Sequence, residues 1–121
     1  MCPTRRACCA RSSTSCSTET PVLVLIWEYR VRPERTEEFA GFYGPDGPWT
    51  AFFREAPGFV SSTLWRDVDT PGRYLVADRW TSAALYEDFK QREAEAYRRL
   101  SERGQRLYER ESALGRFDSV D

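Results

Sequence analysis

The side chains able to carry acid–base chemistry in this sequence are carboxylates, phenols and guanidinium groups, because its 121 residues include no histidine. Without imidazole, Ser–His and Cys–His nucleophile systems and nitrogen-ligated iron or haem sites cannot be built. Glu28 and Asp78 lie in apolar, strand-like segments, where burial would raise the pKa of a carboxyl group towards that of a general base. Arg66 or Arg30 is a candidate to hold an oxyanion. A Tyr-ligated haem stays open as an alternative.

Aromatic side chains are dense, with four Trp, six Tyr and seven Phe, and such rings could line a dry pocket for an aromatic ligand. The rings predicted to bind it are Trp27, Phe52, Trp80, Tyr86, Phe89 and Tyr97. Trp65 and Arg66 end a predicted strand beside a loop, so we expect them, with Glu28 and Asp78, to form the catalytic group. Tyr29 and Tyr74 are candidate hydrogen-bond donors. The alternative is structural: the rings form the core, and the charged groups form cross-strand ion pairs or dimer contacts.

All four cysteines lie in the first sixteen residues. Their positions are Cys2, Cys8, Cys9 and Cys16. The spacing matches no zinc motif, although a site made of all four thiolates stays open. Because the surrounding Arg, Ser and Thr bury little apolar surface, we expect residues 1–20 to be a disordered tail. Residues 21–121 are then expected to form one domain.

The charge and hydropathy patterns exclude several kinds of partner. A net charge of −1 and a pI near 5.6 give no field for nucleic acid or anionic lipid. No apolar run approaches the roughly 20 residues of a membrane span, and polar residues follow Arg5 and Arg6 where a signal peptide needs an apolar stretch. Gly44-x-x-Gly47 is flanked by prolines and does not form a phosphate loop. We therefore expect a cytoplasmic protein with no cofactor, no metal, no nucleic acid and no membrane partner.

Four strands and three helices are predicted, and the first two helices lie together between the first and second strands. Residues 22–31 form an apolar run whose later part alternates, which predicts a strand with Trp27, Tyr29 and Val31 on one face. A helix is expected after Pro33, and a second short helix after the Gly/Pro-rich break at 44–48. Residues 59–66 and 74–80 predict a hairpin joined by a Pro-Gly turn.

A long helix is expected to follow the hairpin, capped by Thr81 or Ser82. Gly104 could interrupt this helix, and Leu107 and Tyr108 could continue it. Residues 113–120 alternate weakly and predict a final edge strand.

The resulting order, β-α-β-β-α-β, is that of a ferredoxin-like α+β fold, in which a four-stranded antiparallel sheet carries its helices on one face. The other sheet face is left bare. An exposed apolar sheet face rarely stays monomeric, so two sheets are expected to pair face to face in a homodimer.

Several short segments resemble the antibiotic biosynthesis monooxygenase family. They are Trp27-Glu28-Tyr29-Arg30-Val31-Arg32-Pro33, Ala56-Pro57-Gly58-Phe59, Trp80-Thr81-Ser82 and Leu114-Gly115-Arg116-Phe117. Their order and spacing cover residues 22–117. The resemblance implies the dimeric α+β barrel of this family, which includes cofactor-independent oxygenases of aromatic polyketides and haem-degrading enzymes. Many relatives carry a His where this chain has Phe89.

Two functions follow from the resemblance and the residue types. One is a cofactor-independent monooxygenase acting on an aromatic or polyketide-like small molecule, in which a substrate carbanion passes an electron directly to O2. Its base would be Glu28 or Asp78, unless the acidity of the substrate suffices. The other is a non-catalytic ligand-binding or accessory dimer, which the missing His favours. Isomerase or cyclase chemistry on the same scaffold is a further alternative.

Overall fold

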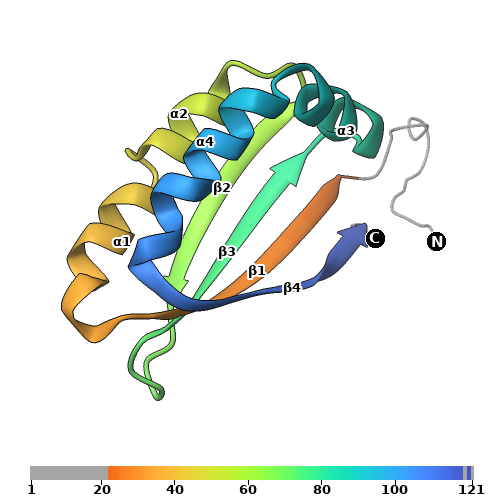
Figure 1. Ribbon diagram of the computed structural model, residues 1–121. Coiled ribbons are helices and arrows are strands. Elements are labelled where there is room, and N and C mark those ends of the chain that lie inside the picture. Colours follow the sequence, from red (N-terminus) through yellow and green to blue (C-terminus); the bar gives the residue numbers. More distant parts are fainter. Residues whose placement is uncertain (1–21, 119, 121) are drawn as a thin grey trace.

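The computed structural model describes residues 22–118 and 120 and forms an α+β fold in two layers (Figure 1). In chain order its elements are β1 (Leu23–Val31), the 3-10 turn η1 (Pro33–Arg35), α1 (Thr36–Tyr43), α2 (Pro48–Arg54), β2 (Phe59–Arg66), β3 (Arg73–Trp80), α3 (Ala83–Arg92), α4 (Ala94–Gly104), the 3-10 turn η2 (Gln105–Leu107) and β4 (Tyr108–Asp118). The four cysteines and the tail predicted at residues 1–20 lie outside the described residues.

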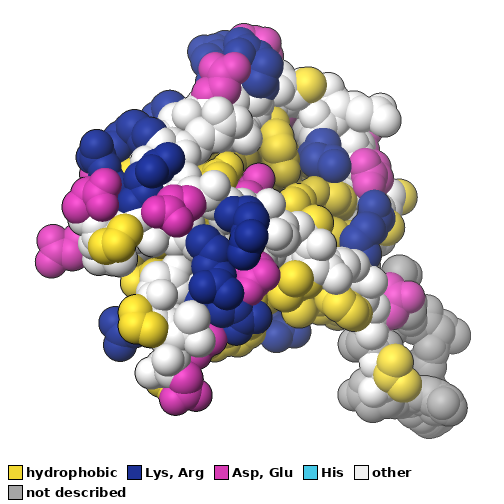
Figure 2. Space-filling model, turned by 60° about the horizontal axis from the view of Figure 1, so that its bottom comes forward, with side chains coloured by type: hydrophobic (Ala, Val, Ile, Leu, Met, Phe, Trp, Pro, Cys, Tyr) yellow, Lys and Arg dark blue, Asp and Glu magenta, His cyan; other side chains and the backbone are white. Residues whose placement is uncertain are grey.

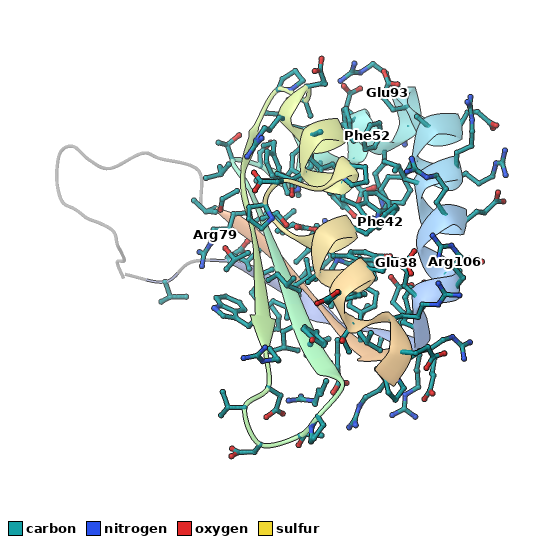
Figure 3. All side chains as sticks on the ribbon, turned by 90° about the vertical axis from the view of Figure 1, so that its left-hand side faces the viewer. Glu38, Phe42, Phe52, Arg79, Glu93 and Arg106 are labelled. Carbon is teal, nitrogen blue, oxygen red and sulfur yellow. The ribbon has the colours of Figure 1, made fainter. Side chains whose placement is uncertain are left out.

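The strands form one antiparallel sheet in the order β2-β3-β1-β4. The helices all cover one face of this sheet, as predicted, and Figure 3 shows the two layers edge-on. Arg79 of β3 points away from the helices in this view. The predicted ferredoxin-like order and the one-sided placement of the helices are therefore confirmed.

Alternation along β1 decides which side chains reach the helices. Tyr29 and Val31 are buried under the helix layer, whereas Glu28 and Arg30 stand on the opposite face. The registers Trp27↔Val76 and Tyr29↔Tyr74 place every second residue of β3 on the same helix-covered face. The face assignment made from the sequence of this strand is confirmed.

Local signals explain most element boundaries. Pro48 opens α2 at a position where the missing amide hydrogen costs nothing. Ser82 caps α3, since its hydroxyl accepts a hydrogen bond from the Leu85 amide at 3.1 Å. Gly58 has φ of +93°, and its carbonyl accepts a 2.7 Å hydrogen bond from the Thr81 amide, so a left-handed glycine joins α2 to β2.

The end of the chain differs from the prediction in two ways. The long helix is divided at Glu93, whose φ of −110° and ψ of 30° are not helical, and Gly104 ends α4 rather than interrupting it. β4 begins at Tyr108, five residues before the predicted strand and within residues expected to extend the helix. Its pairing with β1 from Val31↔Tyr108 onward outweighs the weak local pattern, since strand pairing depends on the neighbouring strand.

The core between the layers is largely aromatic. Phe39 and Trp80 are fully buried, as is Leu107 of η2. Phe39 stacks on Tyr43 with ring centroids 4.6 Å apart, and Trp80 packs against several rings of α2 and α3. Such contacts add to the hydrophobic stabilisation of each buried ring.

Candidate functional site

A cavity of about 190 Å³ lies between the helix-covered sheet face and helices α2 and α4. Its walls are formed by Trp27, Tyr29, Tyr43, Trp49, Phe53, Ser62, Val76, Asp78, Tyr97, Ser101 and Glu111. Six of these eleven residues are aromatic, and none is Arg or Lys. A cavity of about 150 Å³ can hold benzene, so this space accommodates a molecule built on a small aromatic ring.

Asp78 supplies a buried carboxylate to the cavity. Its side chain is only 7% exposed, and its Oδ1 accepts a hydrogen bond of 2.7 Å from the Ser62 hydroxyl. No Arg or Lys of the described chain lies within ion-pair distance of it. Desolvation raises the pKa of Asp78 to about 6, and the Ser62 hydrogen bond opposes the rise. A carboxylate with this pKa is suited to accept a proton near neutral pH.

Glu111 supplies a second carboxylate, on the edge strand β4. It accepts hydrogen bonds from the Tyr29 hydroxyl at 2.6 Å and the Tyr108 hydroxyl at 3.4 Å. Burial raises the pKa of Tyr29 well above its usual value, and the neighbouring Tyr43 and Glu111 raise it further. Burial also raises the pKa of Tyr108, to about 12. Both phenols therefore stay protonated as donors to Glu111.

Trp49 lines the cavity and carries a buried hydrogen-bond donor. Its indole Nε1 is buried and has no partner among the described residues. A buried N–H without an acceptor costs free energy unless a ligand or water completes it. Tyr43, whose pKa burial also raises, lies beside it with ring centroids 6.3 Å apart. This wall can donate to an oxygen of a bound molecule.

The predicted site residues are divided by the structure. Asp78, Trp27 and Tyr97 line the cavity. The other four predicted rings stand behind its wall, where Trp80 contacts Tyr86 and Phe89 and Phe52 contacts Phe89. Trp80, Tyr86 and Phe89 are at most 3% exposed, so these rings shape the cavity rather than line it.

Trp65, Glu28 and Arg66 do not join Asp78. Trp65 is 46% exposed and, like Glu28, lies on the bare sheet face, because both are out of phase with the cavity-lining residues of their own strands. Glu28 forms an ion pair with Arg73, which lowers its pKa. Arg66 is exposed at the end of β2 and does not line the cavity. The four predicted catalytic residues therefore do not lie together. Glu28 forms a cross-strand ion pair, as the structural alternative expects.

Several lining residues escaped the sequence analysis. Trp49, Phe53, Tyr43 and Ser62 are not among the site residues predicted from the sequence. Glu111 was missed because it lies in the part of β4 that the local pattern did not predict. The Tyr29↔Glu111 pairing depends on strand register, which a single sequence signals weakly.

Residues 22–118 and 120 contain no group of three or more His, Cys, Asp or Glu placed to hold a metal ion. Within the same part of the chain, no helix is long and apolar enough to cross a membrane. The cytoplasmic location stays a prediction.

Comparison with known proteins shows which family the chain resembles. Residues 50–103 match the model of the antibiotic biosynthesis monooxygenase family, which confirms the resemblance seen in the sequence. The matched stretch runs from α2 to α4 and contains two of the four marker segments. No curated protein sequence matches the chain at a significant level.

Several solved structures share the fold. The chain is similar to SnoaB, a cofactor-independent oxygenase from Streptomyces nogalater, with 20% identity, a TM-score of 0.63, and coverage of 82% of this chain and 93% of that chain. It is also similar to a candidate antibiotic biosynthesis monooxygenase from Bordetella bronchiseptica, with 20% identity, a TM-score of 0.65, and coverage of 83% and 98%. A third neighbour, protein SO0527 from Shewanella oneidensis, has 16% identity, a TM-score of 0.63, and coverage of 84% and 94%. At these identities the likeness establishes the fold alone.

Proposed function

We propose that the protein is a cofactor-independent monooxygenase of a small aromatic molecule, with Asp78 as its general base. The observation that carries this proposal is a buried carboxylate with a pKa near 6 and no cationic partner, set in an aromatic cavity. The family match and the SnoaB-like fold support the same chemistry.

In the proposed reaction a carbon that carries hydrogen and is conjugated with the phenolate of the substrate, either a ring CH ortho or para to the hydroxyl or the CH2 of an anthrone, becomes a carbonyl. Asp78 removes a proton from the substrate, and the resulting carbanion passes one electron to O2. The two radicals combine into a hydroperoxide, which loses water to leave C=O. One oxygen atom of O2 stays in the product and the other leaves as water, so no further reductant is consumed.

Trp49 would assist by donating its Nε1–H to the substrate oxygen on which negative charge develops. A fixed, buried donor stabilises such charge more than it stabilises the neutral ground state. The surrounding rings exclude water, which strengthens this interaction.

The alternative is a non-catalytic binding protein. It is favoured by one observation: no Arg or Lys lines the cavity, so a developing oxyanion meets hydrogen-bond donors only. The open volume of about 190 Å³ fits either function, and turnover decides between them.

The experiment is oxygen uptake by purified protein treated with a chelator, over a panel of anthrones and hydroquinones. We expect uptake that depends on both protein and substrate, with one water formed per O2 consumed. Absence of uptake together with ligand-induced thermal stabilisation would establish the binding function instead.

Trp49→Phe is expected to lower kcat about 100-fold or more, since loss of an oxyanion-hole donor costs about 2.7–4 kcal/mol in related chemistry. The ring is retained, so KM should change little. Phe52→Leu, behind the cavity wall, is the control and should retain kcat within a few-fold. Equal kcat for Trp49→Phe and the native protein would remove Trp49 from the mechanism.

We further propose a homodimer formed through the bare sheet face. The registers place apolar side chains at the centre of this face, namely Val24, Ile26, Leu75, Ala77, Trp65 and Phe117. Trp65 and Phe117 are 46% and 47% exposed. Charged groups, including the ion pair of Arg73 with Glu28, border this centre, as expected for an interface core with a polar rim.

Ile26→Arg is expected to convert the dimer to a monomer, because an unpaired charge would lie at the centre of the interface. Sedimentation velocity at micromolar concentration measures the change, with Arg99→Ala on the exposed face of α4 as control. A native protein that sediments as a monomer would refute the homodimer.

A further inference from the structure

The charge of the cavity constrains its ligand more closely than its shape does. Asp78 and Glu111 both line it, and neither forms an ion pair within the described chain. Glu28 and Asp67 differ from them, because both form ion pairs with Arg73. The cavity therefore carries negative charge with no counter-charge among its lining residues.

The rings around these carboxylates reinforce the same preference. Trp27, Trp49 and Tyr97 line the same cavity as the two acidic groups. The face of an aromatic ring is electron-rich and attracts a cation, and cages of Trp and Tyr recognise ammonium groups in this way. An anionic ligand would instead meet repulsion from both carboxylates.

Strand register sets the distance between the two acidic ends. Asp78 pairs with Leu25, and Glu111 pairs with Tyr29, so they are four residues apart along β1 and lie on opposite sides of it. At about 3.3 Å per residue and about 4.8 Å between strands, their Cα atoms are about 16 Å apart. With side chains reaching inward from both ends, the intervening space suits one ring with a short polar arm.

The two ends differ in access and in hydrogen bonding. Asp78 is buried, and it accepts a hydrogen bond from the Ser62 hydroxyl. Glu111 is exposed on the edge strand β4, which runs beside β1 along the lower right side of the molecule in Figure 1. Figure 2 turns this edge forward and shows hydrophobic side chains at the surface among charged ones. Glu111 thus marks the solvent-facing end and Asp78 the buried end.

We propose that the substrate is a phenol that carries a protonated amine on a short arm, with its hydroxyl directed to Asp78 and its ammonium to Glu111. The assignment rests on the proposed function for its chemistry, but the binding preference follows from the charges and rings of the cavity. Glu111, exposed and held by Tyr29 and Tyr108, is then a specificity-determining residue rather than a catalytic one.

The test compares three ligands of similar size by isothermal titration calorimetry with the native protein at pH 7.5. They are tyramine, 4-ethylphenol and 3-(4-hydroxyphenyl)propionate, which differ in carrying a positive, a zero and a negative charge on the arm. We expect tyramine to bind at least 10-fold more tightly than 4-ethylphenol and the propionate to bind most weakly. Equal affinities, a preference for the propionate, or no binding of tyramine would overturn the proposal.

Glu111→Gln should weaken tyramine binding about 10-fold and leave 4-ethylphenol binding unchanged. The matched control is Glu109→Gln, since Glu109 lies on the same strand, is exposed, and does not line the cavity. An equal loss in both variants would mean a general charge effect and contradict the assignment. Tight tyramine binding by a protein that takes up no oxygen with the anthrones and hydroquinones would refute the oxygenase function alone, so the two proposals fail separately.

Discussion

Asp78→Asn is expected to abolish oxygen uptake while raising the stability of the protein above pH 6. The amide keeps the shape of the side chain and can still accept the hydrogen bond from Ser62, but it cannot take a proton. Loss of a general base lowers the rate by about 10²–10⁴-fold. The stability gain arises because the native protein must bury an ionised carboxylate with no cationic partner.

The sign of the pH dependence follows from the raised pKa. In the unfolded chain Asp78 loses its proton near 3.8, whereas in the folded protein it holds the proton up to about 6. Burial of Asp78 is therefore least costly below pH 4, and the cost grows as the pH rises through 6. A difference of two pKa units corresponds to about 3 kcal/mol at most, so Asp78→Asn should add about 2–3 kcal/mol at pH 8.

Urea unfolding at pH 4 and pH 8 measures this difference. The variant and the native protein should have similar free energies of unfolding at pH 4 and diverge at pH 8. Asp88→Asn is the control, because Asp88 is exposed and pairs with Arg92 at 3.0 Å, and it should show no such divergence. A variant less stable than the native protein at pH 8 would mean that the Asp78 carboxylate has a stabilising partner.

Gly104→Ala is expected to destabilise the protein by about 1–3 kcal/mol, as overpacking of a core does. Gly104 is buried at the end of α4, and an added Cβ would lie 2.4 Å from the hydroxyl of Tyr43 and 3.1 Å from the ring of Phe42. The Tyr43 ring is packed between Phe39 and Trp49, so it can move only by shifting the cavity wall. Ligand affinity should fall together with stability.

Gly41→Ala is the matched control for this substitution. Gly41 lies in α1, is exposed, and has no atom within 4 Å of an added Cβ. Alanine should therefore stabilise α1 by about 0.5–1 kcal/mol through helix propensity alone. Thermal unfolding of the two variants should give shifts of opposite sign. If both shifts were positive, the contact between α4 and Tyr43 would be looser than the structure indicates.

Much of the fold could be predicted because its signals are local. The strand at 59–66, the face assignment of Trp27 and Tyr29, and the cap at Ser82 all follow from alternation, turn residues and hydrogen-bonding chemistry. The division of the long helix at Glu93 and the early start of β4 carry no such signal. They depend on how α4 and β4 pack against the sheet, and tertiary contacts outweigh propensity there.

The site was harder to predict because it depends on which sheet face a residue occupies. Asp78, Trp27 and Tyr97, which their residue types and positions suggest as site residues, line the cavity. Trp65 has equally suitable chemistry, but one step along β2 separates it from the helix-covered face. Glu111 has no local signal that marks it as a site residue, and only its pairing with β1 opposite Tyr29 brings it to the cavity.

The pH dependence of oxygen uptake tests the central role of Asp78 most directly. Initial rates of the native protein, measured with a chelator present between pH 5 and pH 8, should rise through an apparent pKa near 6 and then level off. The rise reflects the growing fraction of Asp78 able to accept a proton, and Asp78→Asn should stay at background throughout. A rate that does not change with pH, or an Asp78→Asn variant as active as the native protein, would contradict this account.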